Sequence, residues 1–215
     1  MDSSKLSGHY FLNDDNLKSD IKEFKIKIDN YEFKFKTDNG VFSKGELDFG
    51  TELLIKTVLK EKIKGNILDL GCGYGAIGIV LNKILKVNVN MIDVNKRAIH
   101  LTKMNIKEND CSSVLAFLSD GYSNVDKKYD YIVSNPPIRI GKSNLYKLIS
   151  DSKNYLNDCG KIYLVIRREQ GAKTFIKDFS SEYKIDILEK KKGFYIICLK
   201  IWILSWLLLK IMLLI

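Results

Sequence analysis

Two short segments of the chain carry residues that could together do chemistry on an amine. Residues 68–78 read LDLGCGYGAIG, which is typical of a strand that runs into a glycine loop and then a helix. Such a loop lets the backbone approach a nucleoside cofactor, and the helix directs free N–H groups at it. Residues 134–138 read SNPPI, and they place an amide side chain and a proline carbonyl at the end of a later strand. A cofactor loop followed by two acceptors for one NH2 group predicts methyl transfer to nitrogen.

The glycine loop alone fits two kinds of cofactor. Two overlapping patterns within residues 71–78 match the dinucleotide fingerprint, so a nicotinamide cofactor is one alternative. Asp69, just before the loop, would repel a pyrophosphate and favour the ammonium and sulfonium charges of S-adenosylmethionine. Asp93 ends the next predicted strand and would accept ribose hydroxyls, and Asp120 ends the third and would accept from the adenine amine, beside the Gly121 backbone. Three such aspartates lie where an open α/β sheet binds its ligand, so we predict S-adenosylmethionine, although each alone could be a helix cap.

Asn135 is followed by Pro136 and Pro137, the two prolines of the chain. They stiffen the turn and can hold the Asn135 oxygen and the Pro136 carbonyl in place. Both acceptors would grip one exocyclic amine, orient its lone pair and stabilise the positive charge that develops on nitrogen. No strong base is needed for this reaction. This agrees with the sequence, whose two histidines include no candidate for a catalytic base. The alternative interpretation is a rigid turn with Asn as a helix cap.

Hydrophobic patterning predicts the elements that position these residues. Strands are expected at residues 66–70, 88–93, 113–118, 129–134, 160–167, 183–189 and 194–199. Helices are expected at residues 48–63, 76–86, 95–108, 142–157 and 171–180. This alternation predicts an α/β three-layer sandwich with a mostly parallel, seven-stranded sheet. The four residues between the last two strands can only form a hairpin, so the last strand should run antiparallel.

A hairpin and two tails flank this pattern. Residues 24–35 alternate apolar and charged side chains around an Asp-Asn turn, which predicts a small N-terminal β-hairpin. We expect one domain over residues 9–200, with residues 9–47 as its hairpin extension and residues 1–8 as a disordered tail without a signal peptide. Residues 201–215 form an apolar C-terminal tail that is shorter than the ~20 residues of a membrane span. We expect an appended helix or a tail packed on a partner, and membrane association is the alternative.

The composition of the chain limits its possible binding partners and its location. The 215 residues carry a net charge of +9, which fits a nucleic-acid partner. A genome that is biased toward lysine would give the protein the same surface charge. The four cysteines are far apart and form no CxxC pair, so neither a disulfide nor a metal site is expected and a cytoplasmic location fits.

These motifs resemble the class I S-adenosylmethionine-dependent methyltransferases, and within them the 16S (small-subunit) rRNA guanine-N2 methyltransferase family in a small single-domain form. The resemblance covers residues 10–200, and its more specific parts are residues 37–43 (TDNGVFS), 47–51 (LDFGT) and 192–195 (KGFY). It implies the Rossmann-like methyltransferase fold, S-adenosylmethionine as the cofactor and catalysis by Asn135, Pro136 and Pro137. The cofactor contacts that we expect on this basis are Phe42, Gly50, Thr51, Asp69, Gly71, Cys72, Gly73, Asp93, Val94, Asp120, Gly121 and Asn135.

Substrate contacts are expected beside the prolines, at Ile138, Arg139 and Lys142. Ile138 stands where amino-group methyltransferases often have an aromatic ring, so base stacking is expected elsewhere, and Phe42 is one candidate. Further basic residues that could touch phosphate are Arg167, Arg168, Lys190, Lys191 and Lys192. A paired or stacked guanine would have to be extruded into the pocket. Some relatives carry a second, degenerate domain that helps to recognise RNA, and this chain lacks it.

The prediction is therefore a cytoplasmic methyltransferase acting on the exocyclic N2 amine of a guanine in ribosomal RNA or the small ribosomal subunit. Three alternatives remain at this point. The enzyme could act on a protein glutamine or an adenine, because both present a planar NH2 group. The chain could be a non-catalytic RNA-binding or ribosome-assembly factor of the same fold, or a nicotinamide-dependent enzyme. The modified nucleotide and the oligomeric state are not predicted.

Overall fold

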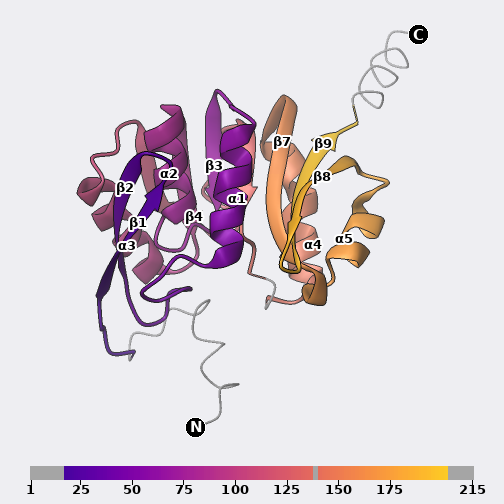
Figure 1. The fold of residues 1–215 in the computed structure, drawn as a ribbon. Coiled ribbons are helices and arrows are strands. Elements are labelled where there is room, and N and C mark those ends of the chain that lie inside the picture. Colours follow the sequence, from indigo (N-terminus) through magenta and orange to yellow (C-terminus); the bar gives the residue numbers. More distant parts are fainter. Residues whose placement is uncertain (1–16, 138–139, 203–215) are drawn as a thin grey trace.

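A computed structural model describes residues 17–137 and 140–202 of the chain (Figure 1). The disordered tail predicted for residues 1–8, the substrate residues Ile138 and Arg139, and residues 203–215 of the apolar tail lie outside the described residues. Within the described ranges, no helix has both the length and the apolar character needed to cross a membrane.

A seven-stranded sheet forms the centre of the molecule. In sequence order its strands are β3 (Asn66–Leu70), β4 (Asn88–Asp93), β5 (Val114–Leu118), β6 (Tyr129–Ser134), β7 (Leu156–Arg167), β8 (Tyr183–Lys191) and β9 (Phe194–Ile201). The spatial order is β5-β4-β3-β6-β7-β9-β8, and β9 runs antiparallel to both of its neighbours. The other pairings are parallel. The predicted fold class, including the reversed last strand, is confirmed.

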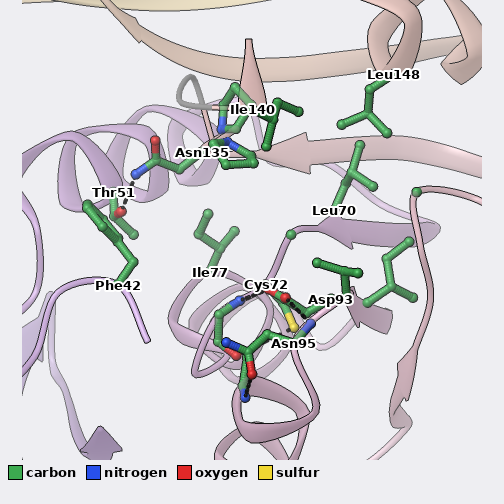
Figure 2. Close-up of a pocket in the computed structure, with 18 of the residues that line it drawn as sticks. Phe42, Thr51, Leu70, Cys72, Ile77, Asp93, Asn95, Asn135, Ile140 and Leu148 are labelled. Carbon is green, nitrogen blue, oxygen red and sulfur yellow. Dashed lines mark hydrogen bonds between the residues drawn. The ribbon is translucent and has the colours of Figure 1, made fainter. Parts of the chain in front are cut away.

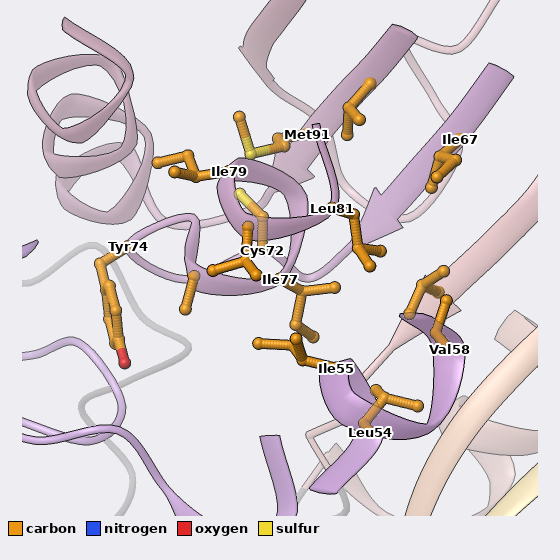
Figure 3. Close-up of a cluster of buried hydrophobic side chains, with 14 of the residues drawn as sticks. Leu54, Ile55, Val58, Ile67, Cys72, Tyr74, Ile77, Ile79, Leu81 and Met91 are labelled. Atoms are coloured by element: carbon orange, nitrogen blue, oxygen red, sulfur yellow. The ribbon is translucent and has the colours of Figure 1, made fainter. Parts of the chain in front are cut away.

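Helices cover both faces of this sheet. They are α1 (Phe49–Lys60), α2 (Ala76–Leu85), α3 (Lys96–Glu108), α4 (Lys142–Asp151) and α5 (Ala172–Phe179). One buried cluster joins α1, α2 and α3 to the sheet, and Figure 3 shows Leu54 and Val58 of α1 beside Ile77 and Leu81 of α2. A second cluster joins α4 and α5 to the opposite face. Each fully buried aliphatic or aromatic side chain stabilises the fold by roughly 1.5–3 kcal/mol.

The predicted N-terminal hairpin consists of β1 (Lys22–Ile28) and β2 (Tyr31–Thr37), and it lies beside α2 and α3 in Figure 1. Asn105 of α3 and Asn109, the C-cap of that helix, hold it there. The Asn105 side chain exchanges hydrogen bonds with the backbone of Lys36 at 2.8 and 3.0 Å. The Asn109 side chain does the same with Lys34 at 3.0 and 2.8 Å. The hairpin is thereby fixed to the C-terminal end of the helix that follows β4.

One predicted helix was wrong in its extent. The helix expected over residues 142–157 ends at Asp151, and a 3-10 turn, η3 (Ser152–Tyr155), leads directly into β7. The first residues of β7 were predicted as helix up to residue 157 and as a link before residue 160, and they include the turn-forming Asn157, Asp158 and Gly160. They nevertheless pair with β6 across an irregularity in the register, so the strand begins at Leu156.

Candidate functional site

A pocket of about 1680 Å³ opens at the carboxyl ends of β3, β4, β5 and β6 (Figure 2). These parallel strands end at one edge of the sheet, which is where open α/β sheets bind ligands. The glycine loop and the Asn-Pro-Pro corner both line this pocket. The Ser134 hydroxyl donates to the Leu70 carbonyl at 2.6 Å and so joins the end of β6 to the start of the loop. The two motifs that the sequence singled out therefore share one cavity.

Backbone hydrogen bonds fix the start of the glycine loop to β4. The amides of Gly71 and Cys72 both donate to the Ile92 carbonyl at 2.9 Å. Gly75 begins α2 with φ of 92°, and a Cβ there would lie 2.9 Å from Thr102. Glycine is needed at this position, both for the left-handed backbone and for the close packing on α3.

Asp93 anchors the loop to the end of β4. One of its carboxylate oxygens accepts from the Gly73 amide and the other from the Asn95 amide, both at 2.9 Å. Burial raises the pKa of this carboxyl, and these hydrogen bonds offset part of the rise. Each oxygen keeps a further lone pair, so Asp93 can still accept hydrogen bonds from a ligand in the pocket that it lines.

Asp69 does not reach the pocket, so the predicted direct contact with a cofactor is not what the structure shows. Side chains alternate along β3, and Asp69 shares the face of Ile67 whereas Leu70 lines the cavity. Asp69 is fully buried beneath α2, where one oxygen accepts from the Gly78 amide at 2.9 Å. The other oxygen has no hydrogen-bond partner among the residues that the structure describes. Burial raises the pKa of this carboxyl to about 7, the Gly78 hydrogen bond opposes the rise, and the charge on Asp93 adds to it.

Asn135 is held by two residues at the start of α1. Its amide nitrogen donates to the Thr51 hydroxyl oxygen at 2.8 Å and lies 3.4 Å from a carboxylate oxygen of Asp48 (Figure 2 shows the Thr51 contact). The same Asp48 oxygen caps the helix by accepting from the Thr51 amide at 3.0 Å and from its hydroxyl at 3.3 Å. With the amide nitrogen engaged, the Asn135 oxygen is the atom that can accept a hydrogen bond from a ligand.

Phe42 enters the pocket from the loop that follows the hairpin, and its side chain remains half exposed. That loop is fixed to the start of α3. The Arg97 guanidinium pairs with the buried Asp38 carboxylate at 3.1 Å, and the Asn95 side chain donates to the Gly40 carbonyl at 2.8 Å. Burial raises the pKa of Asp38, but hydrogen bonds from Ser19 and from two backbone amides, together with the Arg97 charge, bring it below its ordinary value.

The remaining predicted residues divide into two groups. Those that line the pocket are Thr51, Gly71, Cys72, Gly73, Val94, Asp120, Gly121, Pro136 and Pro137. Gly50 and Lys142 do not line it. Gly50 packs against the Phe194 ring, where an added Cβ would lie 2.6 Å from a ring carbon. Lys142 pairs with Asp178 of α5 at 2.9 Å, so its predicted role in substrate binding is not supported.

Sequence reasoning did not identify Asp48 and Asn95 as site residues, although both line the pocket. Each caps a helix through its side chain. The capping signal was present at both positions, but it did not show that these caps face a common cavity.

Comparison with known proteins gives three findings. The Methyltransferase small domain family matches residues 32–198. An uncharacterized Bacillus subtilis protein, YbxB, is 38% identical over 196 residues, which are 89% of this chain and 98% of that protein. Ribosomal RNA small subunit methyltransferase C of Haemophilus influenzae is 34% identical over 151 residues, which cover 68% of this chain but 45% of that protein. The chain therefore spans less than half of that methyltransferase.

A solved structure is also similar. The T. thermophilus 16S rRNA N2 methyltransferase, determined with AdoMet and guanosine, superimposes with a TM-score of 0.76 at 20% identity. The match covers 85% of this chain and 51% of that protein. At this level of identity, the likeness concerns the fold.

Proposed function

The chain belongs to the Methyltransferase small domain family, and on that basis we propose that it transfers a methyl group from S-adenosylmethionine to the exocyclic N2 amine of a guanine in 16S rRNA. The site that would do this is the pocket shared by the glycine loop and the Asn-Pro-Pro corner. The names of the curated and solved relatives support the choice of guanine N2 in small-subunit RNA.

The residues of the pocket fit a nucleoside cofactor with a cationic end. An added Cβ on Gly71 or Gly73 would have its nearest neighbour at 3.9 or 4.0 Å, respectively. No side chain therefore covers the backbone at these two positions, and a ligand can approach it closely. Asp93 would accept the ribose hydroxyls, and the exposed Asp120 would accept the adenine amine. The cofactor supplies a methyl group activated by its attachment to a sulfonium sulfur.

The residues of this chain would then orient the nucleophile. The Asn135 oxygen and the Pro136 carbonyl accept the two hydrogens of the guanine amine, which turns the nitrogen lone pair toward the donor side of the pocket. Asp48, behind the Asn135 amide, adds a negative charge that favours the positive charge forming on nitrogen. The methylated nitrogen then loses its proton to water, so no side chain has to act as a strong base.

The observation that carries this proposal is the Asn135 amide, fixed by Thr51 and Asp48 with its oxygen free to accept. Incubation with methyl-tritiated S-adenosylmethionine and separate RNA, DNA and protein fractions tests it. We expect label in small-subunit RNA. Label confined to protein would favour a glutamine substrate, and cofactor binding without any turnover would favour an assembly factor. A cytoplasmic location is part of the proposal, because ribosomal RNA is its substrate.

A further inference from the structure

We propose that Arg167 and Lys192 form a phosphate-binding rim that holds the RNA backbone beside the target guanine. This inference rests on the proposed function, and it identifies the part of the pocket mouth that would contact the nucleic acid. Arg167 ends β7, and Lys192 lies in the turn between β8 and β9. Both side chains are exposed, and both residues line the same pocket as Asn135.

Two aromatic rings hold the cations in place. The Arg167 guanidinium lies 4.8 Å from the centroid of the Phe194 ring. The Lys192 ammonium lies 4.9 Å from the centroid of the Phe49 ring. The two rings contact each other at 5.5 Å between centroids, so the four side chains form one continuous group. Cations that are packed on rings lose less freedom when they bind an anion than cations on free chains.

The rim lies further along the strand direction than the amine clamp. Ser134 pairs with Leu164 of β7, so Asn135 is one residue beyond that level and Arg167, which pairs with Phe194, is three residues beyond it. The two residues of difference correspond to about 7 Å of strand. A nucleotide whose base reaches Asn135 would therefore keep its phosphates at the level of Arg167 and Lys192. This is the arrangement that an extruded base requires.

Among the described residues, no carboxylate forms an ion pair with the charges of the rim. Neither Arg167 nor Lys192 forms an ion pair with a carboxylate in the described part of the chain, although Glu169 and Glu189 are close in sequence. Lys142, by contrast, is already paired with Asp178. Arginine suits this role because its planar guanidinium binds two phosphate oxygens at once.

The structure also separates these two residues from the other basic candidates. Arg168, Lys190 and Lys191 do not line the pocket, although they lie beside Arg167 and Lys192 in sequence. Lys190 packs over the ring of Tyr195 instead. These three residues could add to the general field of the surface, but of these five basic residues only Arg167 and Lys192 line the pocket that would receive the extruded base.

The experiment compares R167Q/K192Q with K103Q/K107Q, which removes two exposed charges from α3 outside the pocket. The probe is transcribed 16S rRNA, titrated against each protein at several salt concentrations, with AdoMet affinity by calorimetry as the check of folding. We expect R167Q/K192Q to bind the RNA about tenfold more weakly at low salt, with AdoMet affinity unchanged. The slope of log affinity against log salt should fall by about 0.7 for each cation removed, and the control should change little.

An equal loss in both double variants would overturn the rim, because the effect would then be one of net charge. If R167Q/K192Q loses AdoMet affinity, the single variant K192Q is used instead, because Lys192 lies in a turn. K192Q must then bind the RNA more weakly with AdoMet affinity unchanged. Equal weakening of polyglutamate binding would assign the rim to an acidic protein and would also overturn the proposal. If the wild type binds the RNA as expected but transfers no methyl group, the proposed activity fails and the rim stands.

Discussion

The Asn135 side chain donates to the Thr51 hydroxyl oxygen at 2.8 Å, although 84 residues separate the two in sequence. This contact joins the start of α1 to the corner after β6. It engages the amide nitrogen and leaves the oxygen as the acceptor atom of a side chain that lines the pocket. In the proposed function the corner therefore depends on a residue of another element, and we propose that Thr51 positions Asn135.

Replacement of Thr51 tests this relationship. Thr51→Val removes the acceptor for the Asn135 amide, and we expect the methyl-transfer rate at saturating substrates to fall about fivefold, since a net hydrogen bond is worth about 1 kcal/mol. Thr51→Ser should restore most of the rate because it keeps the hydroxyl. Single-turnover kinetics and AdoMet calorimetry separate the two possible roles. A weaker AdoMet affinity with an unchanged rate would assign Thr51 to cofactor binding alone.

Asp93 should act on cofactor affinity first. Asp93→Ala removes the acceptors for the ribose and also the anchors of the Gly73 and Asn95 amides, so we expect AdoMet to bind about 10- to 100-fold more weakly. The rate at saturating cofactor should change only a few-fold. Isothermal titration and steady-state kinetics provide both numbers, with Asp110→Ala as an exposed carboxylate control. An unchanged affinity would show that the cofactor does not use this carboxylate.

Phe42 should contribute to RNA binding by stacking on the base. The rings of Phe49 and Phe194 are covered by Lys192 and Arg167, whereas the Phe42 side chain is 51% exposed at the pocket. Phe42→Ala should raise the KM for 16S rRNA about tenfold, since stacking is worth about 1–3 kcal/mol per base. Phe42→Tyr should retain the wild-type value. If only the AdoMet affinity changes, Phe42 covers the cofactor and does not stack on the base.

The buried Asp69 should make stability depend on pH. Its pKa is about 7 in the folded protein and near 3.8 in the unfolded chain, so the folded state binds more protons between these values. Stability from this group is complete below about pH 4 and declines as the pH rises to about 7, by an amount on the order of 4 kcal/mol. Denaturant titrations of the wild type and Asp69→Asn at several pH values measure the difference. The free energy of unfolding of the wild type should fall relative to the variant across this window, and parallel profiles would contradict the assignment.

Much of the fold could be predicted from the sequence because its signals are local. The pattern of apolar residues predicted both ends of β3, β4 and β6 correctly. The four-residue link before β9 predicted that this strand runs in the opposite direction. The start of β7 could not be predicted, because its pairing with β6 overrides a turn-like composition.

The site was predictable only where one segment carries the information. The glycine loop and the Asn-Pro-Pro corner are such segments, and both line the pocket. Asp69 was predicted to face the cofactor because it directly precedes the loop. That prediction did not take into account that side chains alternate along β3, which directs Asp69 toward α2. The Thr51–Asn135 contact depends on how α1 packs beside β6, and no local pattern encodes that.

The most direct measurement of the central claim is the content of N2-methylguanine in 16S rRNA, mapped by nuclease digestion and mass spectrometry. It should be made in cells that lack this gene and carry either the wild-type or the Asn135→Ala protein. We predict one guanine that is methylated on N2 with the wild-type protein and unmethylated with Asn135→Ala, which should still bind AdoMet. An identical methylation pattern in both strains would contradict the account.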